Sequence, residues 1–414
     1  MGKSWKNVLC AFVLILTAGC VCRDGGSKGA SPEAKKEAKT PSLQKNFFLP
    51  DKIYAVPGVE CNVYFRNIFF AVNHGNFVFD ADCPAGRQEK NRWVFTPSSS
   101  DENKRFPLTV SVYDANGLVA RGSTTVFVSP ADAGKGKKVS ILVVGDSLTN
   151  ATEYPRQLLA LCRKSNAPVL TMIGSHAGNG KTPEKGGVAH EGYGGWAWGT
   201  FLTQYVTDPA DRQYKTYRRA SKFLVYRDGK KVFSLADYVK KYNEGRMPDV
   251  ITFQLGVNDV FGAKEENLPK RIQTILANAD KLIACFRKEA PKALIGVGFV
   301  TGGADQDAFG NNYKCGQTAF GYYRNHFRLN QAMAKHFAAC GDKKLFMIPS
   351  HVNLDTENNF PVTKTCLNAE NRKEVFLQSN GVHPAVSGYR QMGDSFYAWL
   401  KYLLASGAFS PEKK

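Results

Sequence analysis

The order of apolar and polar positions separates a β-rich stretch from a longer stretch of mixed type. Residues 46–130 hold short runs of β-branched and aromatic residues between turn signals, with no helical period. The runs are "KIYAVPG", "CNVYFRNI", "NFVFDADC", "RWVFTP", "PLTVSVYDANG" and "STTVFVSP". Strands at this spacing predict a small antiparallel β-sandwich domain. Because none of the runs carries a catalytic pattern, we expect a structural spacer or, alternatively, a carbohydrate-binding module.

Buried strands alternate with amphipathic helices after the short linker "ADAGKGKK". The continuous apolar runs "KVSILVVGDS", "PVLTMIGS", "DVITFQLG", "ALIGVGFV" and "KLFMIPS" are typical of parallel strands buried on both faces. Helical segments are predicted between and after them, at 152–164, 267–289, 320–340 and 386–404. This alternation predicts a doubly wound α/β domain over residues 138–408. The chemistry of such a domain lies at the carboxyl ends of its strands.

The first residues have the pattern of an export signal. Lysines precede an apolar run from Val8 to Ala18, which is too short to span a bilayer as a mature helix. We therefore interpret residues 1–20 as a signal peptide. "TAGC" resembles a bacterial lipobox in which Cys20 is acylated, although Thr17 stands where leucine is usual. Residues 21–45 are rich in Gly, Ser, Pro, Lys and Glu, which predicts a flexible linker.

These segments predict an exported protein, periplasmic or at the cell surface. It would be tethered to the membrane through lipidated Cys20, or otherwise secreted. The formal charge of +19 does not come from residues 46–130, which carry 8 basic and 8 acidic residues. The basic surface could attract anionic polysaccharides or be a plain solvated face. Nucleic acid is not expected, because the chain has no basic helix and no interleaved aromatic platform.

Export would permit disulfide bonds. Cys61 and Cys83 fall in the same β-rich region and are a candidate pair, whereas the other pairings and the oligomeric state cannot be deduced from the sequence. No C-x-x-C occurs, and no Cys/His group has the spacing of zinc ligands. We therefore predict no metal site.

Four short blocks place chemically useful groups at strand ends or in loops. "VVGDSLTN" puts Ser147 in a tight turn after a buried strand, where it could be a nucleophile or only cap a helix. "QLGVNDVFG" puts Asn258, an amide donor, after another strand. "HEGYGGWAWGTF" offers the backbone N–H of Gly195, and "SNGVHP" holds His383 just before the last helix.

Together, in this order, the blocks resemble those of the SGNH (GDSL-type) hydrolase family, over roughly residues 138–405. The resemblance implies a flavodoxin-like doubly wound fold and a serine esterase that needs no cofactor. It also implies that Ser147 is the nucleophile and His383 the general base. The oxyanion hole would consist of the N–H of Ser147, the N–H of Gly195 and the side chain of Asn258. "HEGYGGW" looks like the second block of members that remove acetyl groups from plant polysaccharides.

One position departs from the family pattern. The family usually has Asp three residues before the histidine, and this chain has Asn380. In serine-protease triads the Asp→Asn change costs about 10⁴ in kcat, yet papain-like enzymes work with an asparagine. Three interpretations stay open. In the first, Asn380 presents its oxygen to Nδ1 of His383; in the second, a backbone carbonyl or another acid serves a Ser–His dyad; in the third, the site is crippled. We expect activity.

Other residues near the blocks are expected to have supporting roles. Asp146 and Asp259 should brace their turns by hydrogen bonding. His176 and His190 could touch substrate, but we expect them to be ordinary surface donors.

The preferred substrate is an acetylated polysaccharide or oligosaccharide. Trp196 and Trp198 could stack on a sugar ring or, as we favour, line the core, and the Tyr/Arg-rich segment 215–233 is expected at the rim of the site. A lipid acyl-esterase or thioesterase is an alternative, but the segments between the blocks are polar, aromatic and basic. A carbohydrate-binding relative with an impaired site is the non-enzymatic alternative.

Overall fold

The computed structural model describes residues 43–309 and 316–409. Residues 42–414 form one compact unit, so the predicted boundary between residues 130 and 138 stays a prediction. The predicted signal peptide, Cys20 and most of the linker lie outside the described residues. The linker was predicted to extend to residue 45, but residues 43–46 form a 3-10 helix. Gln44 in this helix donates a hydrogen bond to the backbone oxygen of Arg121 (2.9 Å).

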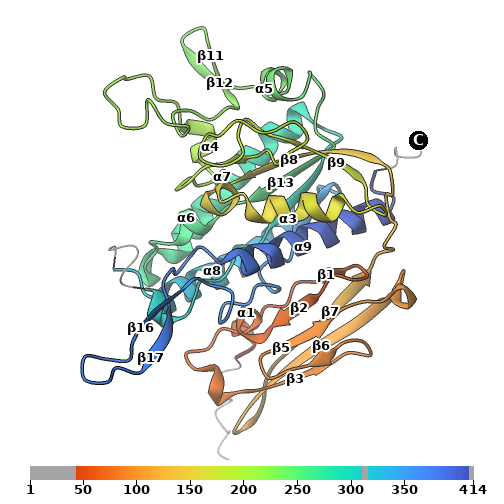
Figure 1. Ribbon diagram of the computed structural model, residues 1–414, viewed down its shortest axis with the longest axis vertical. Coiled ribbons are helices and arrows are strands. Elements are labelled where there is room, and N and C mark those ends of the chain that lie inside the picture. Colours follow the sequence, from red (N-terminus) through yellow and green to blue (C-terminus); the bar gives the residue numbers. More distant parts are fainter. Residues whose placement is uncertain (1–42, 310–315, 410–414) are drawn as a thin grey trace, which may run out of the picture. The chain divides into compact units, whose positions relative to one another are not determined.

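The N-terminal strands form two sheets. One has the order β1-β7-β6-β3 and the other β2-β5-β4 (Figure 1). Side chains of both sheets share one apolar core, which includes Val63, Trp93 and Val110. The pairing is not wholly antiparallel as predicted, because β1 runs parallel to β7. The strands are β1 (Lys52–Ala55), β2 (Cys61–Tyr64), β3 (Val78–Asp82), β4 (Arg87–Gln88), β5 (Arg92–Phe95), β6 (Arg105–Asp114) and β7 (Gly117–Val128).

Two details of this region differ from the sequence predictions. The run "CNVYFRNI" is a strand only as far as Tyr64, and residues 65–68 turn into the short helix α1 (Phe65–Ile68). Cys61 and Cys83 are both free thiols, as are the other cysteines that the structure describes. Burial raises the pKa of the Cys61 thiol to about 12.

The strands after residue 137 form a separate, parallel sheet. Its order is β10-β8-β13-β14-β15, with β9 also paired to β8. All five strands predicted from the apolar runs are present, and the sheet confirms the predicted α/β fold class. Its strands are β8 (Lys138–Gly145), β9 (Val169–Ile173), β10 (Glu191–Gly192), β13 (Val250–Gln254), β14 (Leu294–Gly298) and β15 (Leu345–Ile348).

Helices cover both faces of this sheet. The Phe286 ring of α7 (Leu268–Glu289) packs on Phe253 of β13 (5.3 Å between ring centroids). Gly296 of β14 pairs with the neighbour of Phe253 and therefore faces the opposite side. There, Trp399 of α9 (Val386–Ala405) leaves no room for a Cβ atom on Gly296.

The two faces are completed by α3 (Glu153–Cys162), which packs beside α9, and by α8 (Ala319–Ala338), which contacts α7 (Figure 1). These four long helices match the predicted segments within two residues at each end. The shorter elements are α2 (Ser147–Asn150), α4 (Thr200–Thr203), α5 (Leu235–Tyr242), α6 (Val257–Val260), the hairpins β11 (Leu224–Arg227)–β12 (Lys230–Phe233) and β16 (Val362–Cys366)–β17 (Glu374–Gln378), and the 3-10 helices η1 (Leu43–Asn46), η2 (His74–Asn76), η3 (Ser99–Asp101), η4 (Glu265–Asn267) and η5 (Gln306–Ala308). Within residues 43–309 and 316–409, no helix is long and apolar enough to cross a membrane.

Candidate active site

Ser147 lies just after the carboxyl end of the inner strand β8, as the first residue of α2. The chain turns sharply at Gly145, where an added Cβ atom would lie 1.9 Å from Oγ1 of Thr149. Asp146 fixes the turn, because its Oδ1 accepts a hydrogen bond from the N–H of Leu148 (2.9 Å). The serine is therefore held in a tight, buried turn with its side chain at the edge of the sheet.

His383 lies next to this serine. Its Nε2 atom is 2.9 Å from Oγ of Ser147, which is hydrogen-bond distance. His383 lies in the segment 379–385, here called the histidine turn, between β17 and α9. Burial lowers the pKa of His383 below its ordinary 6.5, so that the imidazole is neutral near pH 7. A neutral imidazole at this distance can accept the proton of the serine hydroxyl.

Asn380 is not arranged as the preferred interpretation assumed. Its Oδ1 accepts hydrogen bonds from the backbone N–H groups of Val382 (3.1 Å) and His383 (2.9 Å). The oxygen closes the histidine turn and does not accept from the ring, because the backbone donors point at it. Among the described residues, none accepts a hydrogen bond from Nδ1 of His383. The orienter interpretation is therefore corrected: Oδ1 of Asn380 holds the backbone of the turn that carries His383.

Gly195 and Asn258 follow the two strands that flank β8. Gly145, the last residue of β8, pairs with β10 on one side and with β13 on the other. The three strands therefore end at the same level. Gly195 has φ +79°, a conformation that favours glycine. Nδ2 of Asn258 donates a hydrogen bond to the backbone oxygen of Trp196 (2.9 Å). This bond ties the loop of Gly195 to the turn of Asn258.

Asp146 braces its own turn, as predicted, whereas Asp259 joins its turn to the loop of the second block. Asp259 accepts from the N–H of Trp198 with both carboxylate oxygens (3.3 Å each). Burial raises the pKa of Asp146 to about 7, and the charge of Asp259 adds to this shift. Burial also raises the pKa of Asp259 to about 6. Both carboxyl groups thus lie beneath the site, where ionisation is costly.

The prediction for the two loop histidines was wrong, because both are buried. His176 is 2% exposed and His190 is fully buried. His190 Nδ1 accepts from the N–H of Gly192 (3.1 Å) and Nε2 lies 3.1 Å from Oγ1 of Thr152. Burial lowers the pKa of His190 to about 3, so the ring is neutral. It holds the second block against the turn after α2.

The sequence analysis missed Glu191, a fully buried carboxylate in the same block. It accepts hydrogen bonds from the N–H (2.5 Å) and Oγ (2.9 Å) of Ser175, from the hydroxyl of Tyr238 (2.7 Å) and from that of Tyr193. A buried carboxylate needs such donors. The signal available in the sequence was a charged residue inside an otherwise apolar and Gly-rich block.

Aromatic and basic side chains lie over the second block. Trp196 and Trp198 are buried in the core, which agrees with the favoured prediction. Arg218 lies above the Gly-rich loop, with Nη1 donating to the backbone oxygen of Gly194 (3.1 Å). Among the described residues, no carboxylate pairs with Arg218. A Cβ atom on Gly194 would lie 3.4 Å from the hydroxyl of Tyr217.

No group of three or more His, Cys, Asp or Glu side chains in the described part of the chain could hold a metal ion. The site combines a hydroxyl, an imidazole and hydrogen-bond donors at the ends of parallel strands. The fold and this constellation define a serine hydrolase of the SGNH type that acts on esters. The chain belongs to the GDSL-like lipase/acylhydrolase family, whose model matches residues 141–396.

Solved structures of esterases are similar in fold. A family 3 carbohydrate esterase from Clostridium thermocellum has 16% identity and a TM-score of 0.39, over 65% of this chain and 100% of that chain. A family 3 carbohydrate esterase from Talaromyces cellulolyticus has 16% identity and a TM-score of 0.37, over 65% and 99%. A carbohydrate acetylesterase family member from Sinorhizobium meliloti has 15% identity and a TM-score of 0.36, over 64% and 99%. No curated protein matches the sequence.

Proposed function

We propose that the protein removes O-acetyl groups from a polysaccharide, with Ser147 as nucleophile and His383 as general base. The observation that carries this proposal is the 2.9 Å distance between Ser147 Oγ and His383 Nε2. His383 takes the hydroxyl proton as Oγ attacks the ester carbonyl carbon. The oxyanion that forms is stabilised by the N–H groups of Ser147 and Gly195 and by the amide of Asn258, each donor worth roughly 3 kcal/mol.

The reaction then proceeds in two halves. Collapse of the tetrahedral intermediate breaks the bond to the sugar oxygen, which takes the proton from His383 and leaves as an alcohol. An acetyl group now esterifies Ser147. Water attacks this ester while His383 again accepts a proton, and acetate is released as Oγ regains it. No cofactor takes part in this scheme.

The surroundings of the site favour a polar substrate over a lipid. The segment that covers Gly194 presents the hydroxyl of Tyr217 and the guanidinium of Arg218. Residues 205–222 hold five basic residues against two acidic ones. A long acyl chain needs an apolar cleft, whereas hydroxyl-rich or carboxylate-bearing sugars can pair with these donors.

The test is acetate release from a panel of acetylated polysaccharides, neutral and acidic, by the wild type and by Ser147→Ala. Release that disappears in the variant is the expected result. Acetyl, butyryl and palmitoyl esters of 4-nitrophenol are assayed in parallel, and a preference for palmitoyl would replace this proposal by the lipid esterase. Glycan binding without any hydrolysis that depends on Ser147 would replace it by the carbohydrate-binding protein.

Export remains part of the proposal. The pattern of residues 1–20 supports a signal peptide, and "TAGC" supports acylation of Cys20. In a bacterial host fed labelled palmitate, the wild type should take up label and Cys20→Ser should not. An unlabelled wild type in the culture medium would instead indicate plain secretion.

A further inference from the structure

A loop at residues 349–361, here called the tether loop, holds both ends of the histidine turn. The tether loop joins β15 to β16. The N–H of Ser379 donates to the backbone oxygen of Pro361 (2.8 Å). The N–H of Ala385 donates to the backbone oxygen of Asn359 (2.9 Å). Because these two bonds lie on either side of His383, the position of the imidazole depends on the position of the tether loop.

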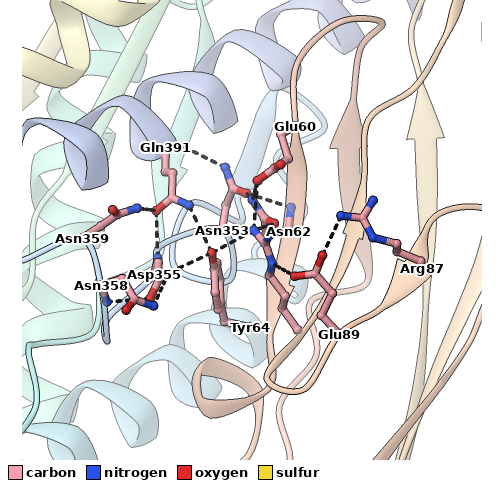
Figure 2. Close-up of polar contacts among 11 residues, drawn as sticks. Glu60, Asn62, Tyr64, Arg87, Glu89, Asn353, Asp355, Asn358, Asn359 and Gln391 are labelled. Carbon is pink, nitrogen blue, oxygen red and sulfur yellow. Dashed lines mark hydrogen bonds and ion pairs between the residues drawn. The ribbon is translucent and has the colours of Figure 1, made fainter.

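The same loop is bound to strand β2 of the N-terminal region (Figure 2). Oδ1 of Asn353 accepts from both the backbone N–H (2.8 Å) and Nδ2 (2.9 Å) of Asn62. The hydroxyl of Tyr64 lies 3.2 Å from Oδ2 of Asp355. The N–H of Tyr64 donates to the backbone oxygen of Val352 (3.0 Å). Asn62 is 1% exposed and Asp355 8%, so these bonds are shielded from water.

Asp355 also sets the shape of the tether loop from within. Its Oδ1 accepts from the N–H groups of Glu357 (3.0 Å) and Asn358 (2.9 Å). Oε1 of Gln391, on α9, accepts from the N–H of Asp355 (2.8 Å) and from Nδ2 of Asn359 (2.9 Å). Figure 2 shows these groups converging between strand β2 and helix α9. The tether loop is therefore hydrogen-bonded to β2 on one side and to α9, the helix that follows His383, on the other.

Arg92 fixes the orientation of the groups on the β2 side. Its Nη1 donates to Oδ1 of Asn62 (2.7 Å) and to the hydroxyl oxygen of Tyr64 (3.1 Å). Since this bond takes the oxygen of the Asn62 amide, Nδ2 is left to face Asn353. The charge of Arg92 is balanced by Glu60 (3.0 Å) and Glu89 (2.7 Å). The inner members of this network, Asn62 and Asp355, are buried and hydrogen-bonded, and such groups specify one arrangement of their partners.

We infer that strand β2 positions the catalytic histidine, with Asn62 and Tyr64 holding the tether loop and the loop holding the histidine turn. The inference rests on the proposed role of His383 as the base. Positioning matters because a displacement of about 1 Å can cost roughly a hundredfold in rate. The N-terminal region is then part of the catalytic apparatus and not a spacer.

Tyr64→Phe tests this inference, with Tyr323→Phe as the matched control. Tyr323, on α8, donates its hydroxyl to the backbone oxygen of Arg66 (2.7 Å), which also joins the N-terminal region but does not involve the tether loop. With 4-nitrophenyl acetate, Tyr64→Phe should lower kcat roughly ten- to a hundredfold with KM within about twofold. Tyr323→Phe should keep kcat within about twofold. Thermal melts of both variants report any common loss of stability.

A readout specific to positioning is the acid limb of the pH profile. A loosened histidine turn admits water to His383. The apparent pKa of the acid limb of Tyr64→Phe should therefore rise toward 6.5, the ordinary pKa of histidine. That of Tyr323→Phe should stay with the wild type. Asp355→Asn, which keeps an acceptor for the amides of Glu357 and Asn358, should retain more kcat than Asp355→Ala.

An unchanged kcat in folded Tyr64→Phe, or equal losses in both tyrosine variants, would overturn the inference. So would equal activities of Asp355→Asn and Asp355→Ala. These outcomes differ from a failure of the proposed function, in which the wild type itself shows no hydrolysis that Ser147→Ala abolishes.

Discussion

Nε2 of His383 lies 2.9 Å from Oγ of Ser147, although the two residues are 236 positions apart in the sequence. The serine follows β8, an inner strand of the parallel sheet. The histidine is held by a turn outside the sheet, which Asn380 closes through two backbone amides. The proposed catalysis thus depends on how accurately a strand end and a turn are brought together.

The pH dependence of activity should reveal whether a charged group acts on the histidine. Burial lowers the pKa of His383, and only the neutral imidazole can accept the serine proton. Activity should therefore persist below pH 6.5 and fall as the pH drops through this lowered pKa. The measurement is kcat/KM for 4-nitrophenyl acetate between pH 4 and 8. A midpoint above 6.5 would instead mean that a carboxylate on Nδ1 raises the pKa.

Restoring the usual family residue at position 380 should change little. In Asn380→Asp one carboxylate oxygen can keep the hydrogen bonds to the amides of Val382 and His383, so kcat should rise less than about tenfold. Asn380→Ala removes both bonds and should lower kcat at least about tenfold, because the turn loses its closure. Steady-state kinetics of the two variants test this. A gain of several orders of magnitude in Asn380→Asp would show that the natural site is impaired.

Two glycines at the site should tolerate a methyl group very differently. A Cβ atom on Gly195 would lie 4.0 Å from its nearest neighbour, a nitrogen of Arg218, so only its φ of +79° is strained. Gly195→Ala should cost about 1–2 kcal/mol of stability. Gly145→Ala forces an atom to 1.9 Å from Oγ1 of Thr149 and should cost several times more. Chemical denaturation of both variants measures the difference, and equal losses would contradict it.

Arg218 should matter for polymeric and acidic substrates only. Arg218→Gln removes a positive charge beside Gly194 that no described carboxylate neutralises. We expect a several-fold higher KM for an acetylated uronate polymer and a change within about twofold for 4-nitrophenyl acetate. Arg218→Lys keeps the charge, and its KM for the polymer should lie between those of the wild type and Arg218→Gln. The same loss on the small ester and on the polymer would mean that Arg218 only supports the loop.

The carboxyl group of Asp146 should make stability depend on pH. Its folded pKa of about 7 lies above its ordinary 3.8, so the unfolded chain releases the proton first and stability falls as pH rises through this window. Asp146→Asn can keep the bond to the N–H of Leu148 and cannot ionise. It should gain stability over the wild type between pH 4 and 8, with about three pKa units setting an upper bound of roughly 4 kcal/mol.

Denaturant unfolding at pH 4 and pH 8 provides the measurement for this prediction. Asp146→Ala is the control: it cannot ionise either but also loses the cap of α2, so it should be about 1 kcal/mol less stable than Asp146→Asn at both pH values. An Asp146→Asn variant whose stability changes with pH as the wild type's does would refute the prediction.

The sequence predicted the parts of the molecule that depend on local pattern. Parallel strands buried on both faces are continuous apolar runs, and long helices keep their period, so the strand carrying Ser147 and the helix after His383 were both found. The proposed nucleophile and base were assigned from their places at these elements. Their 2.9 Å contact could only come from the structure.

The parts that were missed depend on contacts between distant segments. The oxygen of Asn380 turns to two backbone amides because of the conformation of the turn, which residue types do not encode. The burial of His190 and Glu191 depends on Ser175, Thr152 and other partners from separate elements. The network from Asn62 to the tether loop likewise joins residues that are far apart in the sequence.

The division of the site between sheet and turn has a consequence for how the enzyme is inactivated. The nucleophile and the candidate oxyanion donors follow three strands that end level with one another, and these strands belong to the central core. The proposed base lies in a turn outside the sheet, which backbone bonds join to the tether loop and to Ala304. Regions with fewer buried contacts open before the core does. Mild denaturant should therefore move His383 away from Ser147 before the sheet unfolds, which leaves a folded but inactive protein. Its activity should return on dilution of the denaturant, because the sheet does not have to refold.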